Sequence, residues 1–336
     1  MSQARERFHQ LIRGEDLSRT QTEELFGALM DGELSDAMKA ALLVALAMKG
    51  EAASEIAGAA SAMRRRVVAI PHQVDGVVDT CGTGGDGKGT FNISTTAAVV
   101  AAAAGVTIAK HGNRSVSSRC GSADVLTALG VDVDIDPGAA GRALAEVGIA
   151  FLFAPRLHPA MKEVMPVRRE LGVRTIFNVL GPLTNPAGAR RQVMGVYAEG
   201  LVEVIGEVLC ELGADHALVV HGSDGLDELT TTGPSCVAEV RDGTVRTYDL
   251  DPAELGIPRA APEDLAGGSP DDNAAIARRI LDGEGGPLAD VTALNAAAAI
   301  YVGGRAESLA EGLAAARAAL ASGAARRKLA ELAAFE

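Results

Sequence analysis

The sequence predicts an α/β protein: a small N-terminal helical domain followed by a large α/β domain with a mostly parallel central sheet. Three observations lead to this fold class. The residues before Val67 show helical apolar spacing and no strand signal, whereas those after it alternate short apolar runs with helical segments. Aromatic residues make up only 3% of the chain, and the 39 glycines favour helices packed closely on a sheet. Strands alternating with helices are typical of parallel α/β sheets.

The N-terminal region is expected to form helices. Thr20 and Glu23 form a capping-box pattern ahead of one apolar stripe. Ser35 can cap a second helix that Gly50 closes, and a third is expected over residues 52–65. Because Pro71 breaks the pattern, we expect the helical domain to cover residues 1–70 and the α/β domain to cover residues 71–336.

Short strands and helices are expected to alternate after this break. The predicted strands cover residues 76–79, 106–109, 131–135, 150–153, 192–197 and 217–220, and two of the predicted helices cover residues 94–104 and 141–148. In parallel sheets, ligands bind beyond the carboxyl ends of the strands. The glycine-rich segment 82–89 and the segment 221–228 each follow a strand, so both are expected to face one site.

Composition excludes several classes of function. A formal net charge of −13 and few aromatic residues argue against nucleic-acid binding and against an anionic membrane surface. The four cysteines form no CxxC pair, so reduced thiols in the cytoplasm are expected. The N-terminus lacks an apolar signal region, and the longest apolar run, residues 97–106, is too short to span a bilayer.

Positive charge is concentrated in two segments of this acidic chain. The 37 residues between Asp86 and Asp124 contain no acidic side chain but carry two lysines and two arginines. Five of the eight residues from 82 to 89 are glycine. A second basic segment, 151–195, contains seven lysines and arginines against two glutamates. Exposed backbone N–H groups beside positive charge attract anions, so this pattern predicts a phosphate site.

Two familiar phosphate motifs fit only in part. Gly82-x-x-x-x-Gly87-Lys88 resembles a P-loop, but Gly89 follows where Ser or Thr should bind magnesium. Gly82-x-Gly84-x-x-Gly87 resembles a dinucleotide fingerprint, but that motif needs an acidic residue about 20 positions later. The acid-free window contains none, so neither motif is accepted.

A longer set of motifs resembles the anthranilate phosphoribosyltransferase family and spans nearly the whole chain. The matching runs are Asp79-Thr-Cys-Gly-Thr-Gly-Gly-Asp86, Thr90-Phe-Asn-Ile-Ser-Thr95, Lys110-His-Gly-Asn-Arg-Ser-Val-Ser-Ser118, Gly121-Ser-Ala-Asp124, His158-Pro-Ala-Met-Lys162, Thr175-Ile-Phe-Asn-Val-Leu-Gly-Pro-Leu-Thr-Asn-Pro186 and Gly225-Leu-Asp-Glu228. The departures are small: Lys88, Arg119-Cys120 and the stretch 230–232.

The resemblance implies transfer of a phosphoribosyl group from phosphoribosyl diphosphate to anthranilate, in tryptophan biosynthesis, with Mg²⁺ and in a homodimer. It implies that part of the segment 160–180 joins the helical domain. It assigns phosphoribosyl diphosphate to Gly82, Gly85, Asp86, Thr90, Asn92, Ile93, Ser94, Thr95, Lys110, His111, Gly112, Asn113, Arg114, Ser115, Val116, Ser117, Ser118 and Ser122. It assigns anthranilate to Gly82, Asn113 and Arg168, and the metal to Ser94, Asp227 and Glu228.

The residue types suit this chemistry. Glycine lets the backbone approach phosphate closely, and magnesium prefers oxygen ligands such as those of Asp227 and Glu228. An arginine such as Arg168 matches a carboxylate with its planar fork. Because an aromatic amine is already neutral, no strong general base is required. Asp86 is expected to accept hydrogen bonds from ribose hydroxyls or from loop N–H groups. His111 and His158 are candidates for lining the pocket.

Two other functions remain open at this stage. A nucleoside phosphorylase would share the helical-plus-α/β layout, but the Lys110–Ser118 motif and the acidic pair count against it. A non-catalytic relative that binds nucleic acid through the same site is opposed by the complete metal motif and the acidic pI.

Overall fold

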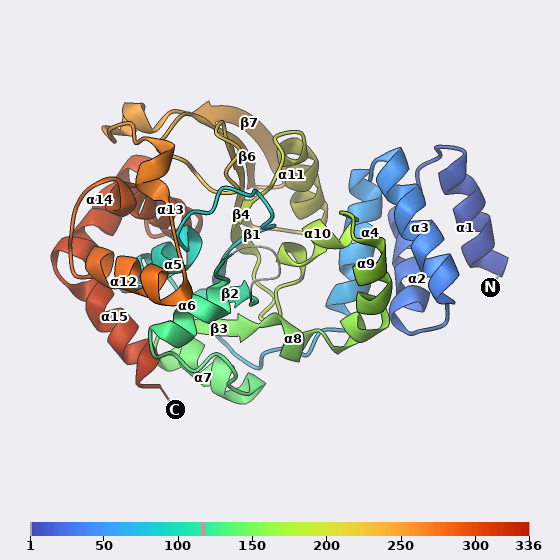
Figure 1. Cartoon of the computed structure of the whole chain (residues 1–336), viewed down its shortest axis with the longest axis horizontal. Helices are drawn as coiled ribbons and strands as arrows, with labels where there is room; N and C mark the ends of the chain where they lie inside the picture. Colours follow the sequence, from blue (N-terminus) through green and yellow to red (C-terminus); the bar gives the residue numbers. More distant parts are fainter. Residues whose placement is uncertain (1, 115–118, 336) are drawn as a thin grey trace.

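The computed structural model describes residues 2–114 and 119–335, and it contains a helical bundle beside an α/β unit (Figure 1). The bundle lies at the N-terminal end of the molecule, and the C-terminal helices lie on the far side of the sheet. Its helices are α1 (Ser2–Ile12), α2 (Arg19–Met30), α3 (Asp36–Lys49) and α4 (Ala53–Arg64). No strand precedes residue 67 in the described chain, as the sequence predicted, and the first strand begins at Val78.

Local capping explains where the bundle helices begin. Ser35 caps α3 as predicted, because its Oγ accepts from the backbone N–H of Met38 at 3.4 Å. The capping box of α2 is formed by Ser18 and Gln21, so the Thr20–Glu23 assignment was wrong. Ser18 has the extended backbone that a cap requires, whereas the Glu23 carboxylate pairs with Arg65 of the neighbouring chain segment. The bundle also gains α1, which the sequence prediction missed.

The sheet has seven strands in the order β3-β2-β1-β4-β5-β6-β7. The strands are β1 (Val78–Gly82), β2 (Ile108–Gly112), β3 (Ile149–Phe153), β4 (Arg191–Gly195), β5 (His216–Gly222), β6 (Ser235–Arg241) and β7 (Thr244–Leu250). The first five are parallel, and β6 and β7 add an antiparallel ribbon at one edge. The predicted fold class, a helical domain with a mostly parallel α/β sheet, is confirmed.

One predicted strand is absent. Residues 131–135 form a loop, although Val131 and Val133 are buried and the residue between them is exposed. The backbone N–H of Asp134 bonds to the Asp132 carboxylate at 2.9 Å, which closes a local turn in place of a ladder. Alternating burial therefore arose here without a neighbouring strand.

Helices cover both faces of the sheet. The α/β unit contains α5 (Ile93–Ala103), α6 (Ser122–Ala128), α7 (Pro137–Glu146), α8 (Ala154–Leu157), α9 (Met165–Leu171), α10 (Phe177–Leu180), α11 (Leu201–Glu211), α12 (Pro270–Leu281), α13 (Pro287–Val302), α14 (Leu309–Ala321) and α15 (Ala324–Ala333). Short 3-10 turns are η1 (Pro159–Glu163), η2 (Pro182–Thr184), η3 (Pro252–Leu255) and η4 (Pro262–Leu265). None of the described helices combines the length and apolar character needed to cross a membrane.

The sheet divides the core into two main layers. Along β5, Leu218 and Val220 pack into the core that contains α5 and α13, whereas Ala217 and Val219 pack into the opposite core. This alternation follows the period of two of a strand. The second core continues through α11 into the bundle, so the bundle and one face of the sheet share one apolar cluster.

Polar contacts also join the bundle to the segment that runs from η1 through α9 and α10 to η2. Lys39 Nζ donates to the Glu163 carbonyl at 2.8 Å, and Arg64 Nε donates to the Leu183 carbonyl at 2.7 Å. Val164 and Val167 are buried in the bundle core. This segment therefore connects the bundle to the edge of the sheet that carries the candidate site.

Candidate active site

The candidate site lies at the carboxyl ends of the parallel strands, where the sheet order reverses between β1 and β4. The glycine loop, residues 82–89, begins at the end of β1. Its Thr83 N–H donates to the Gly195 carbonyl at the end of β4, at 2.9 Å. The Thr83 hydroxyl accepts from the Tyr197 N–H at 3.0 Å. The loop is thus fixed to the neighbouring strand at its start.

The Asp227 carboxylate packs directly against this loop. Its Oδ2 accepts from the Gly84 N–H at 2.6 Å, although the two residues are 143 positions apart. A Cβ at Gly82 would collide with the same oxygen, and a Cβ at Gly195 would collide with the Asp227 carbonyl oxygen. Both positions therefore require glycine, because any side chain would displace Asp227.

Glu228 meets the N-terminus of α5. Its Oε1 accepts from the Ser94 N–H at 3.2 Å, in the first turn of that helix. Free N–H groups and the helix dipole favour an anion at this position. Lys110 Nζ lies close by and donates to the Ser94 hydroxyl at 3.3 Å and to the Thr80 carbonyl at 2.5 Å. The structure therefore brings Ser94, Lys110 and Glu228 together.

The two acidic side chains fit a divalent cation. Burial, and then repulsion by Glu228, raises the pKa of Asp227 well above its usual range. Burial raises the pKa of Glu228 to about 7, against the attraction of Lys110. Two buried carboxylates beside a hydroxyl form a hard oxygen donor set, and a cation would compensate their charge. Within the described residues, no group of three His, Cys, Asp or Glu side chains is arranged to hold a metal, so further ligands would be water or substrate oxygens.

The Lys110 ammonium group interacts electrostatically with the Asp79 carboxylate. Both side chains are buried, with Lys110 3% exposed. Burial lowers the pKa of Lys110, and the attraction of Asp79 opposes this shift. Burial likewise raises the pKa of Asp79, although its Oδ1 accepts from the His111 N–H at 3.1 Å. Asn185 adds a further hydrogen bond to Asp79. The ammonium group is therefore held in a fixed position inside the sheet.

Asn113, directly after β2, contacts Ser122 at the start of α6. The Ser122 hydroxyl accepts from the Asn113 N–H at 3.2 Å, and a Cβ at Gly112 would collide with that hydroxyl oxygen. Arg114 pairs with Asp124 at 3.0 Å. The remaining predicted members of this loop, Ser115, Val116, Ser117 and Ser118, lie outside the described residues.

The predicted donor residues between the glycine loop and the first turn of α5 contact neighbouring parts of the α/β unit. Asn92 Nδ2 donates to the Cys120 carbonyl at 3.3 Å, and its Oδ1 accepts from Asn273 at 2.9 Å. Thr90 pairs with Ala266 in an isolated bridge. Ile93 and Thr95 are buried in the first turn of α5. Asp86 accepts from the Lys88 N–H at 3.2 Å, which is one of the two roles predicted for it.

His111 and His158 form a buried pair. Their Nε2 atoms are 3.1 Å apart and their ring centroids 4.9 Å apart. Burial lowers the pKa of His111 to about 3, helped by His158, and burial lowers the pKa of His158 to about 4. Both rings are therefore neutral near pH 7, and one nitrogen donates to the other.

Arg168 lies on α9, the segment that leads back to the bundle. Its guanidinium carbon is 5.4 Å from the centroid of Phe177, and Nη1 is 3.9 Å from Met165 Sδ. Burial lowers the pKa of Arg168. Of the carboxylates in residues 2–114 and 119–335, none forms an ion pair with Arg168, so its fork is available to an anionic ligand.

Known protein families contain both parts of this chain, the helical bundle and the α/β domain that carries the glycine loop and the acidic pair. Residues 5–67 match the model of a glycosyl transferase family helical bundle domain, and residues 74–326 match the α/β domain of the same family. A protein named anthranilate phosphoribosyltransferase from Anaeromyxobacter dehalogenans (strain 2CP-C) is 56% identical over 322 residues, which cover 96% of this chain and 95% of that protein. The chain belongs to the anthranilate phosphoribosyltransferase family.

Solved structures agree with membership of the anthranilate phosphoribosyltransferases. The crystal structure of the Thermus thermophilus enzyme has a TM-score of 0.93 and 51% identity, with 98% of each chain covered. The Saccharomyces cerevisiae enzyme in complex with PRPP and Mg has a TM-score of 0.85 and 28% identity, with 94% of this chain and 92% of that chain covered. The family and the enzyme class, a glycosyltransferase, are therefore confirmed.

The sequence reasoning missed three residues that shape this anthranilate phosphoribosyltransferase site. Asp79 supports Lys110, Asn185 reaches the same buried network, and Gly195 leaves room for Asp227. Asp79 and Asn185 lie inside matched motifs, but no role was assigned to them. Two features of the sequence could have indicated them: Asp79 is an acidic residue within a short apolar strand, and Gly195 is a glycine at the end of a strand.

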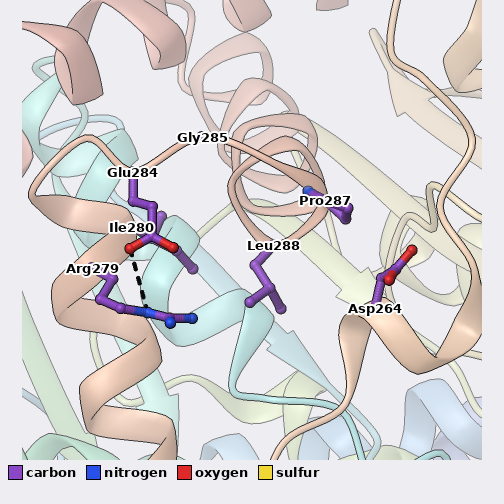
Figure 2. A pocket seen from close by; sticks show the side chains of 7 residues that line it. All are labelled: Asp264, Arg279, Ile280, Glu284, Gly285, Pro287 and Leu288. Carbon is purple, nitrogen blue, oxygen red and sulfur yellow. Dashed lines mark ion pairs between the residues drawn. The ribbon is translucent and has the colours of Figure 1, made fainter.

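Two hollows in the described structure lie away from these phosphoribosyltransferase residues. The smaller is shown in Figure 2, where Arg279 of α12 forms an ion pair at 3.5 Å with Glu284 of the loop that leads to α13. A groove of about 510 Å³ lies at the amino ends of β4 and β5, where Arg190 pairs with Asp215 at 2.6 Å. Neither hollow contains a predicted site residue.

Proposed function

We propose that the protein transfers the 5-phosphoribosyl group of phosphoribosyl diphosphate to the amine of anthranilate, giving N-(5-phosphoribosyl)anthranilate and diphosphate, in tryptophan biosynthesis. The observation that carries this proposal is the meeting of the glycine loop, Lys110 and the Asp227–Glu228 pair at the N-terminus of α5. Its relatives at more than half identity are named for this activity. The nucleoside phosphorylase and nucleic-acid alternatives have no comparable support.

The donor binds through the glycine loop and the loop after β2. The loop glycines give backbone N–H groups close access to phosphate oxygens, and Lys110 supplies a fixed positive charge. The other donor contacts proposed are those that the family motifs assign, from Gly82 to Ser122. Asn113 and Gly82 are proposed to contact both the donor and the acceptor.

The metal proposed is Mg²⁺, held by Asp227, Glu228 and the Ser94 hydroxyl together with substrate oxygens. When bound, it neutralises negative charge on the diphosphate. The buried acidic pair supports this assignment, since Lys110 compensates its charge only in part. The Saccharomyces cerevisiae complex with PRPP and Mg supports it independently.

The acceptor binds through Arg168, whose fork takes the anthranilate carboxylate. Its available guanidinium supports this role. The reaction forms the bond from the amine nitrogen to ribose C1 and breaks the bond from C1 to the diphosphate oxygen. The residues contribute mainly by orienting the neutral amine and by stabilising the departing diphosphate. The amine then loses a proton.

Turnover tests the proposal directly. Purified protein mixed with Mg²⁺, phosphoribosyl diphosphate and anthranilate should release diphosphate and consume anthranilate fluorescence at equal rates. Omission of any one component should stop both signals. A folded protein that leaves both signals flat would refute the proposed function.

We also propose that the protein is a cytoplasmic homodimer. Each chain is proposed to have two domains, a helical domain of residues 1–70 that part of the segment 160–180 joins, and an α/β domain of residues 71–336. Ile12 and Met48, on the packed helices α1 and α3, are 57% and 83% exposed and are suited to an apolar interface. Light scattering should give twice the mass of the 34.3 kDa chain. Substitution of both residues by Lys should give the monomer mass.

A further inference from the structure

Arg174 contacts both the glycine loop and Tyr197, and these two contacts together are called the latch. It lies in the short connection between α9 and α10, and its Nη2 donates to the Gly85 carbonyl at 2.5 Å. Its guanidinium carbon is 4.1 Å from the centroid of the Tyr197 ring, just beyond β4. No role was assigned to either side chain by the family motifs. The two contacts link three separate segments of the chain.

The backbone in the middle of this loop has few contacts with the rest of the protein. Gly84, Gly85, Gly87 and Gly89 all have positive φ, between 66° and 78°, so this backbone is highly flexible when free. The backbone of residues 85–88 has one hydrogen bond to the rest of the described chain, and it is the one that Arg174 donates. The Lys88 N–H bonds only within the loop, to Asp86.

Both ends of the latch are anchored. Gly172 ends α9 with a left-handed φ of 60°, and the Asn178 side chain accepts from the Thr175 N–H at 3.0 Å at the start of α10. On the other side, Tyr197 is tied through its N–H to Thr83 at the start of the loop. The Arg174 guanidinium therefore links the Gly85 carbonyl of the loop to two anchored segments, the connection between α9 and α10 and the residues after β4.

We infer that Arg174 is a positioning residue for the donor: it holds residues 85–88 in the conformation that binds phosphoribosyl diphosphate, through the Gly85 carbonyl and the Tyr197 ring. This inference rests on the proposed function, since it deepens the role of the donor loop. The charge-assisted hydrogen bond acts on the loop, and the cation–π contact with Tyr197 fixes the guanidinium beside it. Loss of the latch should weaken donor binding selectively.

Arg174→Ala tests the inference, with Arg169→Ala as the matched control. Arg169 is an exposed arginine on α9 for which the described structure gives no ion pair or hydrogen bond. Arg174→Ala should raise the KM for phosphoribosyl diphosphate about tenfold, within the range of one charge-assisted hydrogen bond, and leave the KM for anthranilate within about twofold. Arg169→Ala should change neither KM by more than about twofold.

Conservative variants separate the two contacts. Arg174→Lys keeps a donor for the Gly85 carbonyl and should recover part of the affinity, whereas Tyr197→Phe keeps the ring and should raise the donor KM less than Tyr197→Leu does. Tyr197→Leu should raise the donor KM by about threefold, because it removes only the stacking contribution. Equal donor KM values for Arg174→Ala and Arg169→Ala would overturn the inference, as would an equal rise in both substrate KM values.

Direct binding keeps this test separate from the proposed function. Isothermal titration calorimetry with Mg²⁺ and phosphoribosyl diphosphate requires no acceptor. Absence of wild-type turnover would refute the proposed function, while the calorimetric Kd would still report on the latch. An Arg174→Ala protein with wild-type Kd and normal turnover would refute the latch alone.

Discussion

Lys110 and Arg168 are the two cations at the centre of the proposed site, but the protein builds them differently. Lys110 lies on β2, an interior strand, is 3% exposed, and donates hydrogen bonds to Thr80 and Ser94 close to the charge of the buried Asp79. Arg168 lies on a seven-residue helix beside the bundle and touches Phe177 and Met165. The donor half is part of the sheet core, whereas the acceptor half is carried by a connecting segment.

Because of this difference, substitutions in the two halves should have different effects on stability and on substrate binding. A change in the donor half should affect both activity and stability, because its charged groups are buried and mutually dependent. A change in the acceptor half should affect one substrate and leave the fold intact. The predictions below test this contrast, in order of decreasing expected effect.

The acidic pair should give the largest loss of activity. Asp227→Asn combined with Glu228→Gln should lower kcat/KM by about a thousandfold or more, since it removes charged oxygen ligands from the proposed metal site. Circular dichroism should remain native, because both amides keep acceptors for the Gly84 and Ser94 N–H groups. Wild-type rates in this variant would remove the pair from the metal site.

Lys110→Met should damage both fold and function. It leaves Asp79 without its neighbouring positive charge, which should lower the free energy of unfolding by about 3 kcal/mol. The kcat should also fall by about a hundredfold, because a positive charge facing the leaving diphosphate is lost. Urea denaturation and steady-state kinetics measure the two effects. Loss of activity at unchanged stability would contradict the expectation that the donor half contributes to both.

Arg168→Ala should affect recognition alone. The KM for anthranilate should rise about a hundredfold, as expected for loss of a bidentate carboxylate contact worth about 2–3 kcal/mol. The KM for phosphoribosyl diphosphate and the melting temperature should stay close to wild type. Arg168→Lys should recover only part of the affinity, since lysine lacks the planar fork. Equal rises in both KM values would remove Arg168 from the acceptor site.

The buried histidine pair should give the smallest effect, on stability against pH. The folded pKa of His158, about 4, lies below the ordinary value of 6.5, so the unfolded chain binds more protons between these values. Stability from this residue is therefore complete above about pH 6.5 and is lost as pH falls toward 4. His158→Gln should reduce the slope of unfolding free energy in this window by about 1.4 kcal/mol per pH unit. An unchanged slope would show that His158 titrates normally.

Part of the fold was hidden from the sequence for physical reasons. The helix α13 is buried on all sides against α5 and α14, so it lacks the one-sided apolar stripe that marks a helix. The edge strand β7 is largely exposed, and the sequence prediction missed it together with the neighbouring β6. The loop 131–135 has a strand-like alternation without a partner strand. Local pattern reports which side chains are buried, but not what buries them.

The sequence by itself determined the residue types of the site: the glycine loop after β1, the lysine within the acid-free stretch, and the acidic pair after β5. These signals are local, because a motif, or a strand followed by glycine, can be recognised from a few consecutive residues. Only the tertiary structure decided that Gly82, Gly195 and Asp227 touch, and that Arg174 reaches Gly85. Such contacts depend on the order and register of strands far apart in the chain, which short-range periodicity does not specify.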